Sequence, residues 1–287
     1  MKVLIIFSYK WGFYYALQGI KKHSRNSIDF ASYNSITFKE AIEYDTIYVL
    51  NHLCWHTIEK RWGRRLADEL TESRKVILGV GSKKNVLVAL KTINRVKFHY
   101  IRVASHYIKS YLDTKANLHN VKVVQHGVDT NLFKPQGIPR KGFTVGWAGK
   151  FNREEKRTHL LEHLGYNLKI GSNIDYFNMP DFYNSLDVYV CVSVAESSPM
   201  PVLEAMACGL PVVSTEVGIV PEVLKREWIV PTSPEEKVVE ITKRKLKELE
   251  INVDLRKMVG ERNIEEIRCR WSSEVRAKDW DRLFEER

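Results

Sequence analysis

The chain has 287 residues, 44% of them hydrophobic, and its 45 Lys and Arg against 35 Asp and Glu give a formal net charge of +10. This length suits two compact domains with a sizeable core. Since no apolar run reaches about 18 residues, we expect no membrane-spanning helix. The apolar run near the N-terminus is only about five residues long and lacks a small-residue cleavage site, which argues against a signal peptide. The positive charge favours anionic partners such as nucleotide diphosphates, acidic lipid surfaces or nucleic acid, without choosing among them.

Predicted strands and helices alternate through the first half of the chain. The strands are expected at Val3–Phe7, Thr46–Asn51, Val76–Val80 and Val121–Gln125, and the helices at Tyr14–Lys22 and His56–Leu70. This alternation predicts a parallel sheet with helices on both faces. The helix His56–Leu70, preceded by Trp55, mixes aromatic and basic residues. Such a face could lie on an anionic membrane, or it could be solvated with Trp62 packed inward.

A break follows at Phe133–Gly142, where two Pro and two Gly in ten residues suit a linker. We therefore place the domain boundary there, with one domain at 1–135 and a second at 136–287. The second series of strands and helices is expected at Phe143–Ala148, Arg157–Leu164, Asn167–Ile170 and Asp181–Leu186. From Glu235 the tail is mostly helical in pattern, and Trp271, Val275 and Leu283 suit one buried stripe.

The four cysteines are Cys54, Cys191, Cys208 and Cys269, and they form no C-x-x-C pair and have no histidine at zinc spacing. Cys191 and Cys208 lie in apolar strand and helix patterns, so we expect them to be core thiols. Thiols of this kind indicate a reducing, cytoplasmic setting, and we expect no metal site.

The most informative segment follows the apolar run Val188–Val194. Glu196 stands in the next loop, and Glu204 stands in the first turn of a short helix pattern that stops at Gly209 and has Pro201 at its first position. The loop should therefore lie at the carboxyl end of a strand, where open α/β sheets bind ligands and helix amides favour phosphate. Carboxylates for hydroxyl groups and amides for phosphate suit a nucleotide-sugar. The alternative is a buried βαβ unit with two solvated acids.

The string E-x7-E, continued as E-A-M-A-x-G-x-P-V-V, resembles the retaining glycosyltransferases of family 4, which have the GT-B fold. The likeness is best from Val121 to Val223. It implies an α/β fold of two Rossmann-like domains facing a cleft, with a closing helix at about 271–287 that crosses back to the first domain. It also implies a metal-independent transferase that moves a hexose from a UDP- or GDP-sugar without a further cofactor.

The same resemblance implies which residues hold the donor. Val145-Gly-Trp-Ala-Gly149-Lys150, followed by Lys156, resembles the family's Gly-Arg…Lys-Gly signature, with Lys150 in place of Arg and Arg157 in place of Gly. Both lysines would face the diphosphate where other enzymes use a metal, unless they only begin a solvated basic helix. The donor residues so implied are Gly12, Gly149, Lys150, Lys156, Glu196, Ser197, Ser198, Met200, Pro201, Val202 and Glu204. Among these, Glu196 would face the transferred sugar and Glu204 the ribose hydroxyls.

The first domain matches the family less closely. Gly12, after Trp11, stands where the family has a Gly-containing loop, and Gln125–Asp129 resembles the family's N-G-V-D turn with His126 in the Asn position. A structural turn is the alternative for both. His52, after the strand Thr46–Asn51, is the nearest candidate for the family's acceptor-side histidine, offset by one or two positions. A structural or surface histidine is the alternative.

The acceptor is expected on the first domain, because the implied donor residues other than Gly12 all fall after position 145. We expect a glycan or a lipid-linked acceptor. Basic and aromatic residues near each other in sequence further favour contact with an anionic membrane: Lys21, Lys22, Arg25, Arg61, Arg64, Arg65, Trp11, Phe13, Tyr14, Tyr15, Trp55 and Trp62. Two rival hypotheses are a non-catalytic GT-B-shaped binding module and a nucleic-acid-directed protein, for which no recognition motif is present.

Overall fold

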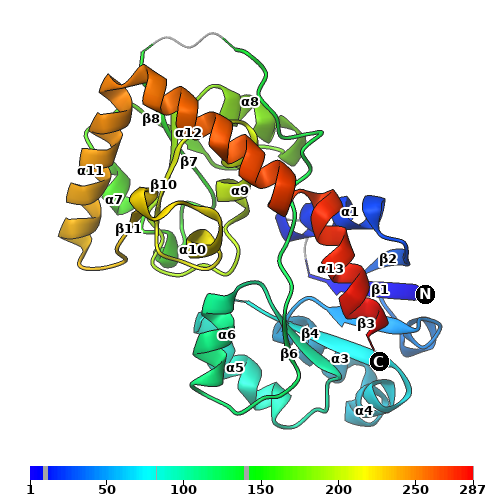
Figure 1. The fold of residues 1–287 in the computed structure, drawn as a ribbon. Helices are drawn as coiled ribbons and strands as arrows, with labels where there is room; N and C mark the ends of the chain where they lie inside the picture. Colours follow the sequence, from blue (N-terminus) through cyan, green and yellow to red (C-terminus); the bar gives the residue numbers. More distant parts are fainter. Residues whose placement is uncertain (9–11, 82, 139–141, 287) are drawn as a thin grey trace. The chain divides into compact units, whose positions relative to one another are not determined.

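The structure is a computed structural model that describes residues 1–8, 12–81, 83–138 and 142–286 (Figure 1). It divides into two compact units, each built on its own parallel sheet. The first unit comprises Met1–Gly127 and Ser273–Arg287, and the second comprises Val128–Ser272. The break after Gly127 thus falls before the expected boundary at 135/136, and the last helix packs in the first unit.

Within its described residues, the first unit has a six-stranded parallel sheet in the order β2-β1-β3-β4-β5-β6. The strands are β1 (Lys2–Phe7), β2 (Ser27–Ser32), β3 (Thr46–Val49), β4 (Lys75–Val80), β5 (Tyr100–Val103) and β6 (Val121–Val123). The sequence pattern missed β2, where only Ile28 is fully buried, and β5, which carries the buried Arg102. The chain reverses its direction of winding between β1 and β3, so the carboxyl ends of these strands are a place where open sheets bind ligands.

The helices of the first unit cover both faces of this sheet. They are α1 (Gly12–His23), α2 (Phe38–Ala41), α3 (His52–Trp62), α4 (Arg64–Ser73), α5 (Lys83–Ile93), α6 (His106–Asp113) and α13 (Ser273–Glu285). The single helix expected at His56–Leu70 is wrong, because Gly63 adopts a φ of +83° that separates α3 from α4. Helix α3 also begins earlier than expected. The Asn51 side chain caps it by accepting hydrogen bonds from the amides of Leu53 and Cys54, both at 3.0 Å.

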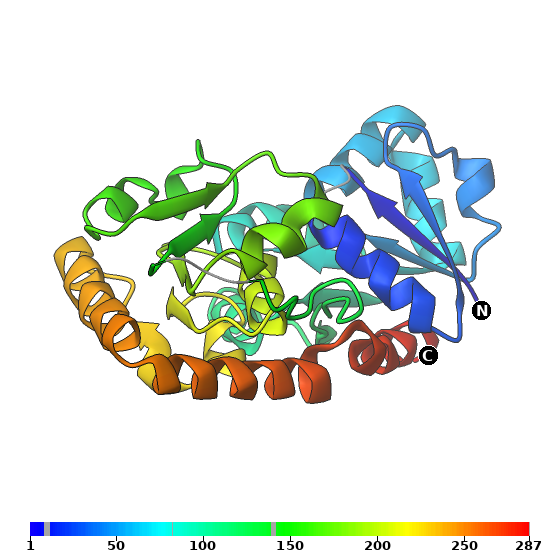
Figure 2. The same ribbon diagram turned by 90° about the horizontal axis from the view of Figure 1, so that it is seen from above.

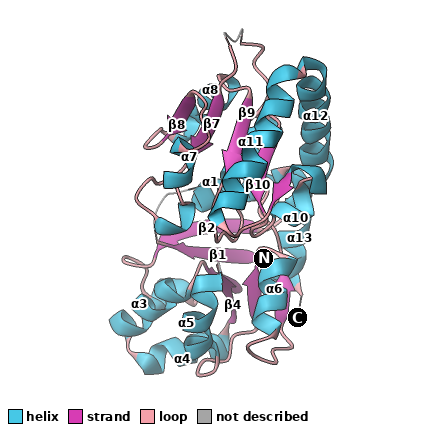
Figure 3. Cartoon of the chain, turned by 90° about the vertical axis from the view of Figure 1, so that its left-hand side faces the viewer, coloured by secondary structure: helices cyan, strands magenta, loops and turns pink. Residues whose placement is uncertain are grey.

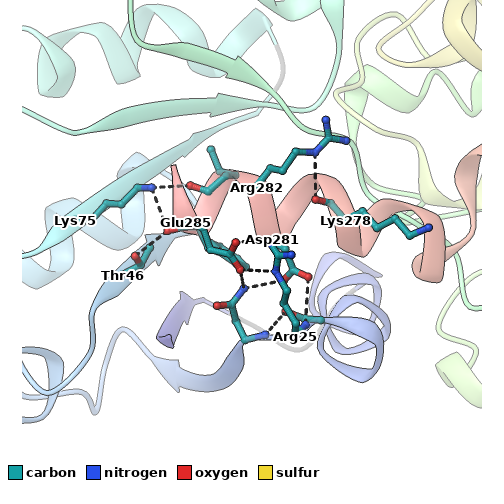
Figure 4. Close-up of polar contacts among 11 residues, drawn as sticks. Arg25, Thr46, Lys75, Lys278, Asp281, Arg282 and Glu285 are labelled. Atoms are coloured by element: carbon teal, nitrogen blue, oxygen red, sulfur yellow. Dashed lines mark hydrogen bonds and ion pairs between the residues drawn. The ribbon is translucent and has the colours of Figure 1, made fainter. Parts of the chain in front are cut away.

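Helix α13 lies against α1 in the first unit (Figures 1 and 2). The two helices approach so closely at Gly19 that a Cβ there would lie 2.5 Å from the Ser273 hydroxyl. Asp281 accepts hydrogen bonds from Ser24, from the Arg25 amide and from Asn26 (Figure 4). These contacts hold the last helix on the first unit, as the resemblance implied.

The expected buried stripe near α13 is confirmed in part, because Trp271 and Leu283 are buried. Its buried residues include Ala277, Trp280, Leu283 and Phe284, whereas Trp271 precedes the helix and Val275 is only half-buried. The Trp280 indole donates a hydrogen bond to the Gln125 carbonyl at 2.9 Å. Lys75 and Thr46 donate to carbonyls near the end of the same helix (Figure 4).

The second unit has a parallel sheet of five described strands in the order β11-β10-β9-β7-β8 (Figure 3). The strands are β7 (Val145–Ala148), β8 (Leu168–Gly171), β9 (Val188–Cys191), β10 (Val212–Thr215) and β11 (Ile229–Val230). The helices are α7 (His159–Glu162), α8 (Met179–Asn184), α9 (Met200–Ala207), α10 (Val220–Val223), α11 (Glu235–Ile251) and α12 (Val253–Glu266). Short 3-10 turns at Glu154–Lys156, Tyr176–Asn178 and Arg226–Trp228 and a π-helical turn at Ile267–Trp271 complete it.

Buried apolar side chains form the cores of both units. Cys54, Cys191 and Cys208 are buried thiols, which confirms the expectation for the last two. Among the described residues, no helix combines the length and the apolar character needed to cross a bilayer.

Candidate functional site

Strands β7 and β9 are neighbours at the centre of the second sheet, and they pair in register from Val145 opposite Val188. The chain leaves β7 toward β8 on one side and returns to β9 on the other. Their carboxyl ends therefore form the crossover point at which α/β sheets bind ligands. The loops that begin there carry Gly149 after β7 and Glu196 after β9.

A charged pair joins these two loops. Lys156 Nζ lies 2.5 Å from Glu196 Oε1, and only 15% and 14% of the two side chains are exposed. The Ser193 hydroxyl donates a second hydrogen bond to the same carboxylate oxygen at 2.9 Å. Burial lowers the pKa of Lys156, but the attraction of Glu196 outweighs it, and the net pKa is raised. The lysine is therefore a permanent cation at the carboxyl edge of the sheet.

Arg157 anchors the loop that follows β9. The residue is only 5% exposed and its backbone is left-handed, with a φ of 47°. Its guanidinium donates to the carbonyls of Val192 and Thr232, both at 2.8 Å, and to that of Ser193 at 3.3 Å. The sequence departs from the family's glycine here, yet the turn keeps the backbone conformation that glycine favours. The long side chain uses that position to bind the segment leading to Glu196.

Glu204 lies in the second turn of α9, not in the first as expected, and is only 4% exposed. The hydroxyl of Tyr183, from α8, donates a hydrogen bond to its Oε2 at 2.8 Å. Burial raises the pKa of Glu204 to about 7, although the Tyr183 hydrogen bond acts in the opposite direction. The carboxyl group therefore changes its charge near neutral pH.

The backbone between the two glutamates offers fewer amides than its length implies. Pro199 and Pro201 have no N–H, Pro201 is the second helical residue, and the Val202 amide donates to the Pro199 carbonyl at 2.9 Å. Among residues 198–202, the amides of Ser198 and Met200 remain for a ligand. Gly218 packs against this loop, where a Cβ would lie 2.3 Å from the Ser197 carbonyl oxygen.

Gly149 and Lys150 follow β7 directly. Gly149 has a φ of +151°, and a Cβ there would lie 3.1 Å from the ring of Trp147. The chain can therefore turn close to the Lys156 side chain only with a glycine at this point. Lys150 is exposed at the same edge.

The candidate site residues described in the first unit are Gly12, His52 and His126. Gly12 begins α1, while Trp11 lies outside the described residues. His52 begins α3 after β3 and is 5% exposed. His126 is fully enclosed, with its ring stacked on Phe13 at 4.8 Å between centroids and its Nε2 3.1 Å from Arg102 Nη1.

Several aromatic and basic residues expected on a membrane surface instead pack or form hydrogen bonds within the first unit. Trp55 is completely buried, and the half-buried Trp62 donates to the Ile36 carbonyl at 3.1 Å. Arg61 donates to the carbonyls of Tyr33 and Ile36, and Arg25 pairs with Glu285. The prediction of a membrane surface is therefore wrong for Trp55, which is buried. Arg61 and Trp62 are engaged in hydrogen bonds to backbone carbonyls.

The sequence did not point to Ser193, Tyr183 or Gly218 as parts of the site. Ser193 contacts Glu196, Tyr183 contacts Glu204, and Gly218 packs against the backbone of the loop at Ser197. Neither spacing nor composition marks these residues in the sequence. Among the residues that the structure describes, no three His, Cys, Asp or Glu side chains gather as they would around a metal ion.

Comparison with known proteins assigns the chain to a family. The family described as glycosyl transferases group 1 matches residues 75–265. The chain belongs to this family. The match includes β7, β9, both glutamates and the lysine pair of the candidate site.

Two curated proteins resemble parts of this chain. The lipopolysaccharide core biosynthesis mannosyltransferase LpsB of Rhizobium meliloti is 42% identical over 150 residues, covering 36% of this chain and 42% of that protein. An uncharacterized glycosyltransferase of Methanocaldococcus jannaschii is 35% identical over 85 residues, covering 26% of this chain and 22% of that protein. The matches thus span less than half of either relative.

Solved structures share the fold over the full chain. HepE of Anabaena, in complex with UDP and glucose, has a TM-score of 0.78 at 15% identity and covers 100% of both chains. Sucrose-phosphate synthase from Thermosynechococcus elongatus has a TM-score of 0.75 at 14% identity, covering 99% of this chain and 98% of that one. The expected α/β fold of the GT-B type is thereby confirmed.

Proposed function

We propose that this group 1 glycosyltransferase is a retaining, metal-independent hexosyltransferase that uses a nucleotide diphosphate sugar. The observation that carries the proposal is the partly buried pair of Lys156 and Glu196 in the loops that follow β7 and β9. It joins a cation suited to phosphate and a carboxylate suited to sugar hydroxyls at the crossover point of the sheet.

The donor residues divide by the part of the molecule that each would hold. Lys150 and Lys156 would bind the diphosphate, with Gly149 leaving room for it. Glu196 would accept hydrogen bonds from the sugar, and Glu204 from the ribose. The amides of Ser198 and Met200, at the start of α9, would bind the sugar or a phosphate oxygen.

The reaction follows from this division of charge. As the bond from the anomeric carbon to the phosphate breaks, negative charge grows on the departing nucleotide, and the two lysines stabilise it. The acceptor hydroxyl attacks from the face that the nucleotide leaves, and its proton passes to the leaving phosphate. Retention then needs no covalent bond to a side chain, and positioning supplies much of the rate. The lysines would do what a metal ion does in other transferases.

The names of two relatives support the proposed class of donor. HepE is seen with UDP and glucose, and LpsB is named a mannosyltransferase, which supports a UDP- or GDP-hexose here. We further propose that the acceptor, a glycan or a lipid-linked sugar, binds the first unit near His52, and that the enzyme works in the cytoplasm at an anionic membrane surface.

The test is a thermal-shift screen with UDP-, GDP- and ADP-sugars, followed by an assay of slow donor hydrolysis. A ligand selective for the native state raises the melting temperature, so one donor series should stabilise the protein and be hydrolysed. Stabilisation by none of them would refute the proposal. Stabilisation with neither hydrolysis nor transfer would identify a binding module instead.

A further inference from the structure

A pocket of about 430 Å³ lies in the first unit between α3 and α5, and none of the proposed donor residues lines it. These two helices are neighbours on one face of the sheet (Figure 3). The volume is in the range of small-ligand sites. Its lining includes His52 at the start of α3, Arg64 at the start of α4 and Arg95 just after α5.

The charged side chains that line the pocket are mostly basic. Lys60 from α3, Arg64 from the start of α4 and Lys91 from α5 all face it. The acidic residue in the lining is Glu59, whose charge is matched by Arg95 at 2.5 Å. Within the described part of the chain, no ion pair engages Lys60, Arg64 or Lys91. The pocket therefore has a surplus of positive charge, which suits an anion.

Large apolar side chains stand exposed beside these cations. Leu53 and Val88 line the pocket, with exposed fractions of 62% and 49%, and the neighbouring Leu87 is 54% exposed. They come from both helices that form the pocket walls. Apolar side chains next to basic ones are typical of surfaces that contact lipid, where the first enter the apolar layer and the second meet the headgroups.

A buried polar atom of one lining residue has no hydrogen-bond partner among the described residues. Only 5% of His52 is exposed, and its Nδ1 makes no hydrogen bond among the described residues. Burial and the nearby His56 lower the pKa of His52, so its ring is neutral. A neutral ring nitrogen left unpaired at such a depth is costly, and a polar group of a ligand would satisfy it.

We propose that this pocket binds the phosphate headgroup of an anionic lipid, with Leu53, Leu87 and Val88 in contact with the acyl chains. Lys60, Arg64 and Lys91 neutralise the phosphate, and His52 binds a polar atom of the headgroup. The inference rests on the proposed function for its biological meaning, because it names the residues and the lipid chemistry that would bring the enzyme to its acceptor.

The first test is co-sedimentation with vesicles of phosphatidylcholine, alone or mixed with phosphatidic acid. The wild-type chain should bind only the mixed vesicles, and the double variant Lys60→Glu, Lys91→Glu should lose at least about tenfold in partition coefficient. The matched control is Lys237→Glu, Lys243→Glu on α11, which makes the same change of net charge at exposed positions. The control should bind as the wild type does. Equal losses in both double variants would show attraction by net charge alone and overturn the proposal.

The second test separates a lipid from free phosphate. Monomeric dihexanoyl phosphatidic acid should raise the melting temperature of the wild type, whereas inorganic phosphate at the same concentration should raise it much less. Leu53→Ser with Val88→Ser should abolish the advantage of the lipid. An equal rise with inorganic phosphate, or an undiminished lipid effect in the serine variant, would refute the lipid site. Neither test uses a nucleotide-sugar, so lipid binding without sugar transfer would refute the proposed function and leave this site standing.

Discussion

The ionisation of Glu204 should make the stability of the second unit depend on pH in a predictable way. In the folded chain its pKa is raised from 4.5 to about 7 by burial in α9. Because the folded state binds this proton more tightly than the unfolded chain, the associated stability is complete below 4.5 and is lost as the pH rises through 7. A shift of this size corresponds to about 3 kcal/mol of unfolding free energy. Glu204→Gln keeps the shape and removes the charge, so it should abolish this loss.

The assay is native-state hydrogen exchange of the slowest amides of Val128–Ser272, which reports the local unfolding free energy of that unit. It should be run on the wild type and on Glu204→Gln across the interval between the two pKa values. As the pH rises, the unfolding free energy of Glu204→Gln should increase relative to that of the wild type, by up to about 3 kcal/mol. Parallel profiles for the two proteins would refute the reasoning, since they would mean that Glu204 does not titrate in this interval.

Two tyrosine variants provide a further test of the Glu204 titration and its control. The Tyr183 hydroxyl donates to Glu204 Oε2 and holds its pKa below the value that burial alone would set. Tyr183→Phe should therefore raise the pKa further and move the loss of stability to higher pH. The buried Tyr189 hydroxyl contacts the Ala148 backbone instead, so Tyr189→Phe is the matched control and should leave the position of the transition unchanged.

Four further predictions concern the proposed reaction and the loop before Glu196. Glu204→Ala should weaken nucleotide binding by about 1.5–3 kcal/mol in calorimetry, and an unchanged Kd would remove it from the ribose site. Turnover should survive EDTA, and a loss restored by manganese or magnesium would contradict the role given to the lysines. Lys150→Ala and Lys156→Ala should each lower kcat more than they weaken donor binding, because the leaving-group charge develops in the transition state. An unchanged kcat with equal losses in donor binding and in kcat/KM would contradict this prediction. Arg157→Gly should lower the unfolding free energy by about 2 kcal/mol or more, measured in denaturant. Unchanged or higher stability would mean that the gain in backbone fit exceeds the three lost hydrogen bonds.

Much of this protein could be predicted from short stretches of sequence. The alternation of apolar strands with amphipathic helices is a local property, so it predicted a parallel α/β sheet in each half. The spacing of Glu196 and Glu204 and the residues after them predicted the family, because a ligand-binding turn needs particular residues at fixed distances along the chain. Strand β2 was not predicted, because few of its side chains are buried. The helix predicted across Gly63 is two helices in the structure, although the sequence pattern is continuous there.

Only the tertiary structure decided how the site residues meet. Lys156 reaches Glu196 from the loop of a different strand, and Arg157 binds carbonyls from two distant segments. The depth of Glu204 beneath Tyr183, which sets its pKa, depends on how α8 packs against α9. The place of α13 on the first unit likewise rests on Gly19 and Asp281, far apart in the chain. Contacts of this kind arise between segments separated in sequence, and no local pattern specifies them.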